Sequence, residues 1–225
     1  CWWDNSKGQS TPPNNLSDVY DISTGWQHSC ALTINWIVTC WWDNSKGQST
    51  PPNNLSDVIQ ISAGYDNTCA LKSDDTIICW WANQWWQTDI PSDITDITQL
   101  SVWNDYICAL KSIGTIVCWG AGSVVTPPIG LDNVTQVSAW AEAACALKSD
   151  GTVVCWGSNQ YSQLSVPLWL TGVTQISVWY AFVFAVKSDG TVVHWGYSPL
   201  LSAMAPPTWL TDVTQISHTY LHTCT

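Results

Sequence analysis

Hydrophobic residues in this chain come in short runs that also contain polar residues and are broken by turn-forming residues. Val134-Thr-Gln-Val-Ser138 is one such run, and Thr152-Val-Val-Cys-Trp156 is another. Thr, Val and Ile dominate the runs, and Gly, Pro, Asn and Asp separate them, which is typical of β-strands joined by turns. No segment carries the apolar stripe of an amphipathic helix. The pattern predicts an all-β fold.

The runs recur with a nearly fixed period. A Cys-Trp or His-Trp pair marks each repeat, and successive pairs are 39, 39, 39, 37 and 39 residues apart; the pairs begin at Cys1, Cys40, Cys79, Cys118, Cys155 and His194. Residues 1–19 recur unchanged as residues 40–58. A repeat of this length has room for about four short strands, the size of a propeller blade. We therefore predict one domain over residues 1–225, a six-bladed β-propeller of four-stranded antiparallel blades.

We call the four expected strands of a repeat A (134–138), B (through 145–147), C (through 154–156) and D (around 163–165). A three-residue loop, Ser149–Gly151, between strands B and C places Cys145 directly opposite Cys155. Directly opposed residues on antiparallel strands are close enough for a disulfide, although free buried cysteines are an alternative. The same spacing predicts four bonds: Cys30–Cys40, Cys69–Cys79, Cys108–Cys118 and Cys145–Cys155.

The fifth repeat and the chain ends extend this argument. In the fifth repeat both cysteine positions change together, to Phe184 and His194, as expected if the two partners are bonded elsewhere. In the same register Cys224 takes the first position and Cys1 the second, so the two ends would complete one blade with a fifth disulfide, Cys1–Cys224. Alternatives are a bond to Cys1 of the next molecule, giving a head-to-tail polymer, and lipidation of Cys1.

The segments Cys-Ala-Leu-Lys-Ser-Asp-Gly-Thr-Val-Val-Cys-Trp-Gly (145–157), Trp-Gly-Ser-Asn-Gln-Tyr-Ser-Gln (156–163) and His-Thr-Cys (222–224) resemble the regulator-of-chromosome-condensation repeat. The resemblance covers essentially the whole chain. It implies a propeller with a central channel but no single function, because members include exchange factors, light sensors and enzyme inhibitors. The bacterial branch, which includes the propeller-type β-lactamase inhibitory protein, is the most similar in style.

The chain departs from this pattern mainly where glycine is expected. Gly gives way to Trp3, Trp42 and Trp81 directly after the constant Trp of the repeat. Trp36 and Asp75 occupy the glycine position of the B–C turn, where a left-handed backbone would strain them. The chain also has six repeats, whereas familiar members commonly have seven blades.

Two of the four connections vary strongly between repeats. Because antiparallel strands alternate in direction, the A–B and C–D loops emerge on one face of the propeller, and the nearly constant B–C turns and D–A links on the other. The variable loops are rich in Trp, Tyr, Asn, Asp and Ser, a composition that resembles an antibody binding surface. We predict that this face binds a ligand through Trp26, His28, Tyr65, Asp66, Trp85, Trp86, Trp103, Asp105, Tyr106, Trp140, Glu142, Tyr161, Trp179, Tyr180, Phe182, Tyr220 and His222.

Some of these aromatic residues have a structural alternative. Trp103, Trp140 and Trp179 replace a loop glycine and could plug the mouth of the channel. The Trp that recurs once per repeat, as at Trp119 and Trp156, is interpreted as a core residue.

No motif predicts catalysis, a metal or a cofactor. Asp66, Asp105 and Glu142 share one loop position on consecutive repeats and could form an acidic arc, but adjacent blades hold them too far apart for a paired-carboxylate mechanism. His28 and His222 share another position without a third ligand at diagnostic spacing. We therefore predict no enzyme activity, no metal and no cofactor. A catalytic site at the channel mouth is a remaining alternative.

The charge balance limits the partners. Six basic residues, all Lys, stand against seventeen acidic ones, and the net charge is −11. This argues against nucleic acid and anionic membrane surfaces, and favours basic partners. Ten cysteines indicate an oxidising compartment, so we expect a secreted or cell-surface protein.

Together these features predict an extracellular, inhibitor-like module that binds a protein through its aromatic loops. One alternative is a lectin, because Trp and Tyr surfaces with Asn and Asp also suit sugars. Another is a structural protein that polymerises through its terminal strands. Asn15, Asn54 and Asn133 begin glycosylation acceptor patterns on the D–A links, away from the predicted face.

Overall fold

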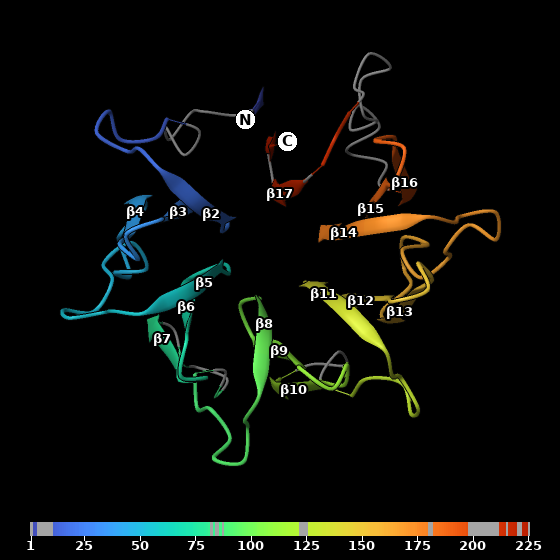
Figure 1. Cartoon of the computed structure of the whole chain (residues 1–225), viewed down its shortest axis with the longest axis horizontal. Coiled ribbons are helices and arrows are strands. Elements are labelled where there is room, and N and C mark those ends of the chain that lie inside the picture. Colours follow the sequence, from blue (N-terminus) through green and yellow to red (C-terminus); the bar gives the residue numbers. More distant parts are fainter. Residues whose placement is uncertain are drawn as a thin grey trace.

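The computed structural model describes residues 2–3, 11–81, 83, 86, 88–121, 126–179, 182–197, 212–214, 216–219 and 222–224, with the backbone alone for 2–3, 217–219 and 222–224. This part of the chain contains eighteen strands and no helix, so the predicted all-β class is confirmed. The strands form six three-stranded sheets arranged around a central axis (Figure 1). The innermost strand is the first of the triplet in five sheets and β17 in the sixth.

Five sheets are built from consecutive strands. They are β2 (Val19–Thr24), β3 (His28–Thr33), β4 (Val38–Trp42); β5 (Val58–Ala63), β6 (Asn67–Lys72), β7 (Ile77–Trp81); β8 (Ile97–Val102), β9 (Tyr106–Lys111), β10 (Ile116–Gly120); β11 (Val134–Trp140), β12 (Ala143–Lys148), β13 (Val153–Gly157); and β14 (Val173–Trp179), β15 (Phe182–Lys187), β16 (Val192–Gly196).

The sixth sheet combines strands from both ends of the chain. β1 (Trp2–Trp3) pairs with β18 (His222–Cys224), which pairs with β17 (Ser217–Thr219). β17 lies between β14 and β2 in Figure 1, so this sheet fills the space between the fifth and the first. The predicted Cys1–Cys224 bond lies outside the described residues and stays a prediction.

The B–C hairpins have the predicted register. Cys145 is paired with Cys155, the Lys148 amide donates to the Thr152 carbonyl at 2.8 Å, and Gly151 has a φ of 80°. All four disulfides predicted within hairpins are present, with Cα–Cα distances of 4.0–4.1 Å. In the fifth hairpin Phe184 and His194 occupy the same opposed positions, and their rings stack with centroids 5.7 Å apart.

Side chains on the innermost strands join successive sheets. Gln60 Oε1 accepts a hydrogen bond from the Leu100 amide (2.7 Å), and its Nε2 donates to the Leu100 carbonyl (3.2 Å). Ser62 Oγ accepts from the Val102 amide at 3.0 Å. An innermost strand has one edge without a neighbouring strand, and these bonds satisfy its backbone groups. The Gln acceptor recurs at Gln99, Gln136 and Gln175.

The predicted fourth strand is not found among the described residues, which have turns there. In the segment after β13, the Leu164 amide donates to Asn159 Oδ1 (2.9 Å), and the Tyr161 amide donates to Gln163 Oε1 (2.8 Å). Gln163 is buried, and its carbonyl accepts a hydrogen bond from the Trp195 indole of the next sheet. Side chains therefore satisfy the backbone groups that a fourth strand would have paired.

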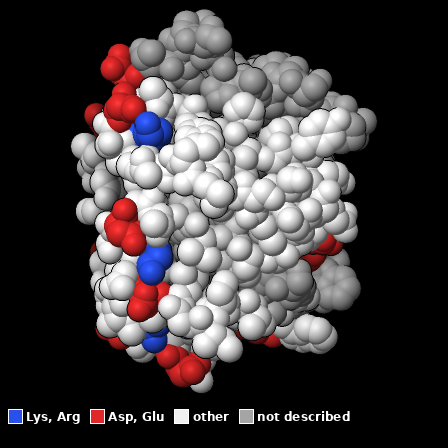
Figure 2. Space-filling view, turned by 90° about the vertical axis from the view of Figure 1, so that its right-hand side faces the viewer, with Lys and Arg blue, Asp and Glu red and all other residues white. Residues whose placement is uncertain are grey.

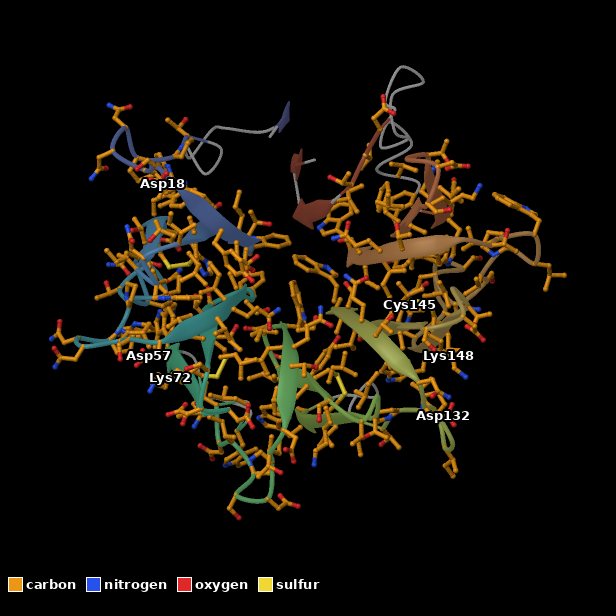
Figure 3. All side chains as sticks on the ribbon, viewed as in Figure 1. Asp18, Asp57, Lys72, Asp132, Cys145 and Lys148 are labelled. Carbon is orange, nitrogen blue, oxygen red and sulfur yellow. A yellow bond between two sulfur atoms is a disulfide. The ribbon has the colours of Figure 1, made fainter. Side chains whose placement is uncertain are left out.

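Charged side chains gather along one edge of the molecule, and most of the broad side in Figure 2 is without them. The ion pairs of the described residues all involve lysines at the end of a B strand: Lys72–Asp74 (3.4 Å), Lys148–Asp132 (3.2 Å) and Lys187–Asp189 (3.0 Å). Figure 3 shows Lys148 beside Asp132 at the outer end of β11. The constant B–C turns thus carry ion pairs with exposed acids.

Candidate binding face

The variable loops lie together, as the alternation of strands predicts. Backbone hydrogen bonds link the start of a C–D loop to the A–B loop of the same sheet: Asp43 to Gln27 (3.0 Å), Ala121 to Asp105 (2.7 Å) and Ser158 to Glu142 (2.7 Å), donor named first. B–C turns are linked to D–A links in the same way, for example Ser149 to Asn133 (2.8 Å). We call the first surface the loop face and the second the turn face.

A chain of aromatic rings follows the A–B loops from one sheet to the next. Trp26 stacks on Tyr65 with centroids 4.8 Å apart, and the edge of Tyr65 meets Trp103 at 6.0 Å. The chain continues through Trp103–Trp140 (3.6 Å), Trp140–Trp179 (6.3 Å) and Trp179–Phe182 (6.3 Å). Aromatic pairs with centroids about 4.5–7 Å apart attract one another beyond the area that they bury. Six of the predicted residues are therefore brought into one continuous row.

The row has a buried part and a partly exposed part. Trp103, Trp140, Trp179 and Phe182 are at most 9% exposed and belong to the hydrophobic core. Trp26 and Tyr65 are half-buried and pack against that core. Only the Trp26–Tyr65 pair, which we call the aromatic platform, offers ring surface to solvent. Trp103, Trp140 and Trp179 are thus core residues, and the alternative that they plug the mouth of a channel stays a prediction.

Two further predicted residues, His28 and Tyr106, are buried beneath the loops. His28 Nε2 lies 2.8 Å from Thr68 Oγ1, its Nδ1 has no hydrogen-bond partner, and burial lowers its pKa to about 4. The Tyr106 hydroxyl donates to the Ala143 carbonyl at 3.3 Å. Burial, and to a smaller extent Asp105, raise the pKa of Tyr106 well above its usual value. Both side chains are neutral core residues here and cannot touch a ligand directly.

The three acids of the predicted arc differ in exposure. Asp66 and Asp105 are half-buried, and burial raises the pKa of each; for Asp66, nearby Lys46 partly opposes this rise. Glu142 is exposed. Asp66 directly follows Tyr65 of the aromatic platform. A half-buried carboxylate that lacks full hydration gains from a cation brought next to it.

The remaining predicted residues are scattered or not described. Tyr161 and Glu142 line a recess of about 240 Å³ on the loop face with Ala141, Ser158, Gln160 and Gln163. Trp86 is 68% exposed. Trp85, Tyr180 and Tyr220 lie outside the described residues, and for His222 only the backbone is described. No group of three or more potential metal ligands occurs in the described part of the chain.

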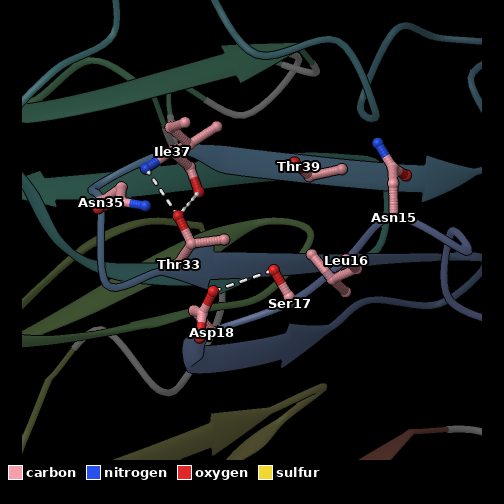
Figure 4. A pocket seen from close by; sticks show the side chains of 8 residues that line it. All are labelled: Asn15, Leu16, Ser17, Asp18, Thr33, Asn35, Ile37 and Thr39. Carbon is pink, nitrogen blue, oxygen red and sulfur yellow. Dashed lines mark hydrogen bonds between the residues drawn. The ribbon is translucent and has the colours of Figure 1, made fainter.

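A second recess lies on the turn face. It has a volume of about 240 Å³ and is lined by Asn15, Leu16, Ser17, Asp18, Thr33, Asn35, Ile37 and Thr39 (Figure 4). Two of its polar groups are already used locally, because Thr33 Oγ1 accepts from the Ile37 amide (3.3 Å) and Ser17 donates to Asp18 (3.0 Å). It contains the Asn15 acceptor pattern, which the sequence places away from the loop face.

Sequence reasoning missed the buried glutamines of the C–D loops. Gln48 is fully buried, and its carbonyl accepts hydrogen bonds from Thr68 Oγ1 (3.1 Å) and the Trp80 indole (3.0 Å). Gln48 thereby fixes the C–D loop of one sheet against the next sheet. The signal was present, because Asn44 and Gln48 recur at the same spacing as Asn159 and Gln163.

The model of the Regulator of chromosome condensation (RCC1) repeat matches residues 58–80 and 134–163. With the fold, this confirms the predicted resemblance: the chain has an RCC1-like repeat β-propeller architecture. No curated protein sequence matches the chain.

Solved structures share the fold at low identity. The ectodomain of the receptor kinase CR4 from Physcomitrella patens is 19% identical, with a TM-score of 0.69 over 86% of this chain and 57% of that one. The CRINKLY WD40 ectodomain of the Arabidopsis thaliana receptor kinase ACR4 is 23% identical, with a TM-score of 0.67 over 81% and 73%.

A third similar structure is Prp20p from Saccharomyces cerevisiae, described with its binding properties to Gsp1p and histones. It is 19% identical, with a TM-score of 0.65 over 82% of this chain and 58% of that one. The chain thus spans less than two thirds of the CR4 and Prp20p chains. At these identities the likeness shows the fold alone.

Proposed function

We propose that this chain is an extracellular binding module whose loop face holds a basic segment of a protein partner. The observation that carries the proposal is the aromatic platform, in which the half-buried rings of Trp26 and Tyr65 stack at 4.8 Å directly beside Asp66. Preformed aromatic surface at the rim of a rigid scaffold is typical of binding sites.

The chemistry of the platform favours cations. A Lys or Arg side chain gains by lying over a Trp or Tyr ring, and more so when a carboxylate is within reach. Burial raises the pKa of Asp66 and Asp105, so both carboxylates are under-solvated before a ligand arrives. The net charge of −11 would also speed the approach of a basic partner.

Several findings support the wider setting of this proposal. Four disulfides suit an oxidising compartment, and two of the similar structures are receptor ectodomains. Repeat propellers of this kind are used as binding surfaces, and Prp20p is described as binding proteins. An inhibitor-like role, a six-bladed ring and the absence of catalysis remain part of the proposal.

The test is binding of a labelled oligolysine peptide, compared with an oligoglutamate peptide of the same length, measured by fluorescence anisotropy at low and high salt. We expect the chain to bind oligolysine alone, and the double variant Trp26→Ala/Tyr65→Ala to bind about tenfold more weakly, equivalent to about 1.4 kcal/mol.

The matched control is the variant Tyr20→Ala/Trp36→Ala. Tyr20 and Trp36 are a second exposed aromatic pair, with ring centroids 6.1 Å apart. Neither belongs to the loop face, because Tyr20 is the second residue of β2 and Trp36 lies in a B–C turn of the turn face. This control should bind like the parent. Equal losses in both variants would show that general surface charge attracts the peptide. Binding to a glycan array instead of oligolysine would favour the lectin alternative.

A further inference from the structure

Four exposed tryptophans lie at backbone positions with a left-handed conformation. Their φ values are 64° for Trp36, 79° for Trp42, 73° for Trp81 and 58° for Trp86. Their side chains are 45–68% exposed. A bulky residue with positive φ is strained, because its Cβ approaches the backbone carbonyl. Such strain persists only where the surrounding structure demands it or a function uses it.

Most of the corresponding positions in other repeats are glycine with the same conformation; Asp75 (φ 65°) and Ser162 (φ 59°) are exceptions. Gly120, Gly157 and Gly196 stand where Trp42 and Trp81 stand, with φ of 97–107°. Trp36 corresponds to Gly114, Gly151 and Gly190, with φ of 77–80°. Trp86 corresponds to Gly47, with φ of 90°. The fold therefore uses left-handed backbone directly after the constant Trp and in the B–C turn of all five sheets built from consecutive strands, and glycine is the residue that meets this requirement without strain.

The same exchange runs through the whole sequence. Six of the eighteen tryptophans are the constant core residue of the repeat, and ten of the other twelve align with glycine in another repeat of this chain. These ten, which we call the glycine-slot tryptophans, are Trp3, Trp36, Trp42, Trp81, Trp86, Trp103, Trp140, Trp169, Trp179 and Trp209. Directly after the constant Trp, the position holds Trp three times, Gly three times and nothing else.

Selection for a side chain does not explain this pattern. At Trp36, Trp42, Trp81 and Trp86 the strained backbone carries a largely exposed indole, whereas Trp103, Trp140 and Trp179 are buried and on a different connection. The glycine-slot tryptophans thus share no common surface and no common degree of burial, although Trp140 contacts both Trp103 and Trp179. What all ten share is a glycine at the same position in at least one other repeat.

We infer that in the organism that makes this protein the glycine-slot tryptophans are glycine, because their codon is UGA and is decoded there as glycine. UGA is a stop codon in the standard code and is read as tryptophan or as glycine in different bacteria. One codon with these two readings exchanges Gly for Trp and for no other residue. The constant tryptophans, encoded by UGG, are unaffected.

This inference changes the molecule at one place that matters for ligands. With glycine at positions 103, 140 and 179, three of the four buried rings of the aromatic row are absent, and the space that their indoles fill in the core is freed. Trp26 and Tyr65 do not stand in glycine positions, since their counterparts are Asn104 and Ala141. The two rings of the aromatic platform are therefore kept under this inference, although Tyr65 loses its contact with Trp103. The two proposals are tested by different measurements, and either can fail without the other.

The identity test has two measurements. The coding sequence should have UGA at the glycine-slot tryptophans and UGG at Trp2, Trp41, Trp80, Trp119, Trp156 and Trp195. Peptide mass spectrometry of the protein from its source should find glycine at positions 42 and 81 and tryptophan at 41 and 80. Tryptophan in the native peptides at 42 and 81, or UGG codons at these positions, would overturn the inference.

A physical test uses purified variants. Trp36→Gly and Trp36→Ala both remove the indole, but only glycine relieves the left-handed backbone. We expect the glycine variant to unfold about 2–4 °C higher than the alanine variant. At Trp26, whose φ is not positive and whose counterparts are not glycine, the order should reverse, because glycine adds flexibility to the unfolded chain. If the glycine variant unfolded at the higher temperature at both positions, the left-handed backbone at Trp36 would not be the cause, and the structural support for the inference would be lost.

Discussion

The sheet β2–β3–β4 and the sheet β11–β12–β13 have the same topology and register but differ in how well they are buried. Cys30 faces Cys40 in one, and Cys145 faces Cys155 in the other. On the innermost strand of the first sheet, Val19 and Ile22 are 38% and 43% exposed, whereas the matching Val134 and Val137 are 5% and 1% exposed. The first sheet thus has the same strand pairing and the same disulfide as the other sheet, although its apolar side chains are less buried.

Four of the positions at which the two sheets differ affect hydrogen bonds, charge or backbone conformation. The first sheet has Asp21, His28, Thr33 and Trp36 where the other has Gln136, Ala143, Lys148 and Gly151. In three of these positions the first sheet lacks a favourable feature of the other sheet. These features are the amide donor of Gln136, the ammonium group of Lys148 that pairs with an acid, and the glycine at positive φ, Gly151. The first sheet therefore reveals which repeat residues the fold can lose while the hairpin register stays the same.

Removing the disulfides gives the largest expected effect. The variants Cys30→Ala/Cys40→Ala and Cys145→Ala/Cys155→Ala should each lower the free energy of unfolding by about 3 kcal/mol, because the closed loops are equal in length. Chemical denaturation of the two variants measures this. A much larger loss in the first sheet would mean that its disulfide replaces the missing burial, and that loop closure alone does not set the cost.

His28 should make the first sheet sensitive to acid. Burial lowers its pKa from 6.5 to about 4, so the unfolded chain binds a proton more readily than the folded one. The stabilisation is complete above pH 6.5 and is lost as the pH falls towards 4, by roughly 3 kcal/mol. His28→Ala, which copies Ala143, should flatten this part of the pH profile whatever its effect at pH 7. An unchanged slope would assign the acid sensitivity to other groups.

Much of the hairpin could be predicted from the sequence because its rules are local. A three-residue turn fixes which residues face one another, so the positions of Cys145 and Cys155 followed from counting. The paired loss at Phe184 and His194 was informative for the same reason. The grouping of A–B and C–D loops on one face followed from strand direction alone.

The missing fourth strand and the burial of the aromatic residues could not be read in this way. Both depend on contacts between sheets. The sequence around Gln163 has strand-like neighbours, but its buried side chain binds the backbone of its own loop and competes with strand pairing. Trp103 and Trp140 stand in variable loops, yet they pack on each other across two sheets. Variation between repeats therefore identified the loops but did not separate exposed from buried members.

Asp21 and its counterpart Gln136 allow the two sheets to be compared at a single position. It accepts a hydrogen bond from the Ile61 amide at 3.3 Å but, as a carboxylate, cannot donate to the Ile61 carbonyl as Gln136 donates to Ile176 at 3.0 Å. Asp21→Gln should raise the free energy of unfolding at pH 7 by about 1 kcal/mol. The reciprocal Gln136→Asp should lower it by at least as much.

The pH dependence distinguishes this effect from simple repacking. Burial raises the pKa of Asp21 above its usual 3.8, despite the opposing Ile61 amide bond. The folded protein therefore holds this proton more tightly, and the contribution of Asp21 to stability is greatest below pH 3.8 and declines as the pH rises through its folded pKa. The gain from Asp21→Gln should accordingly vanish in acid. A gain that is constant with pH would point to packing and not to charge.

The ion pair between Lys148 and Asp132 should give the smallest effect. Its atoms are 3.2 Å apart, but the Asp132 side chain is 63% exposed, and exposed pairs contribute little because water and salt screen them. Lys148→Thr, which copies Thr33 of the first sheet, should lower the free energy of unfolding by about 0.5 kcal/mol or less, and high salt should abolish the difference. Denaturation curves at two salt concentrations measure it. A larger, salt-independent loss would mean that the methylene groups of Lys148 pack on the turn face, so that the difference between the two sheets lies in apolar contacts even here.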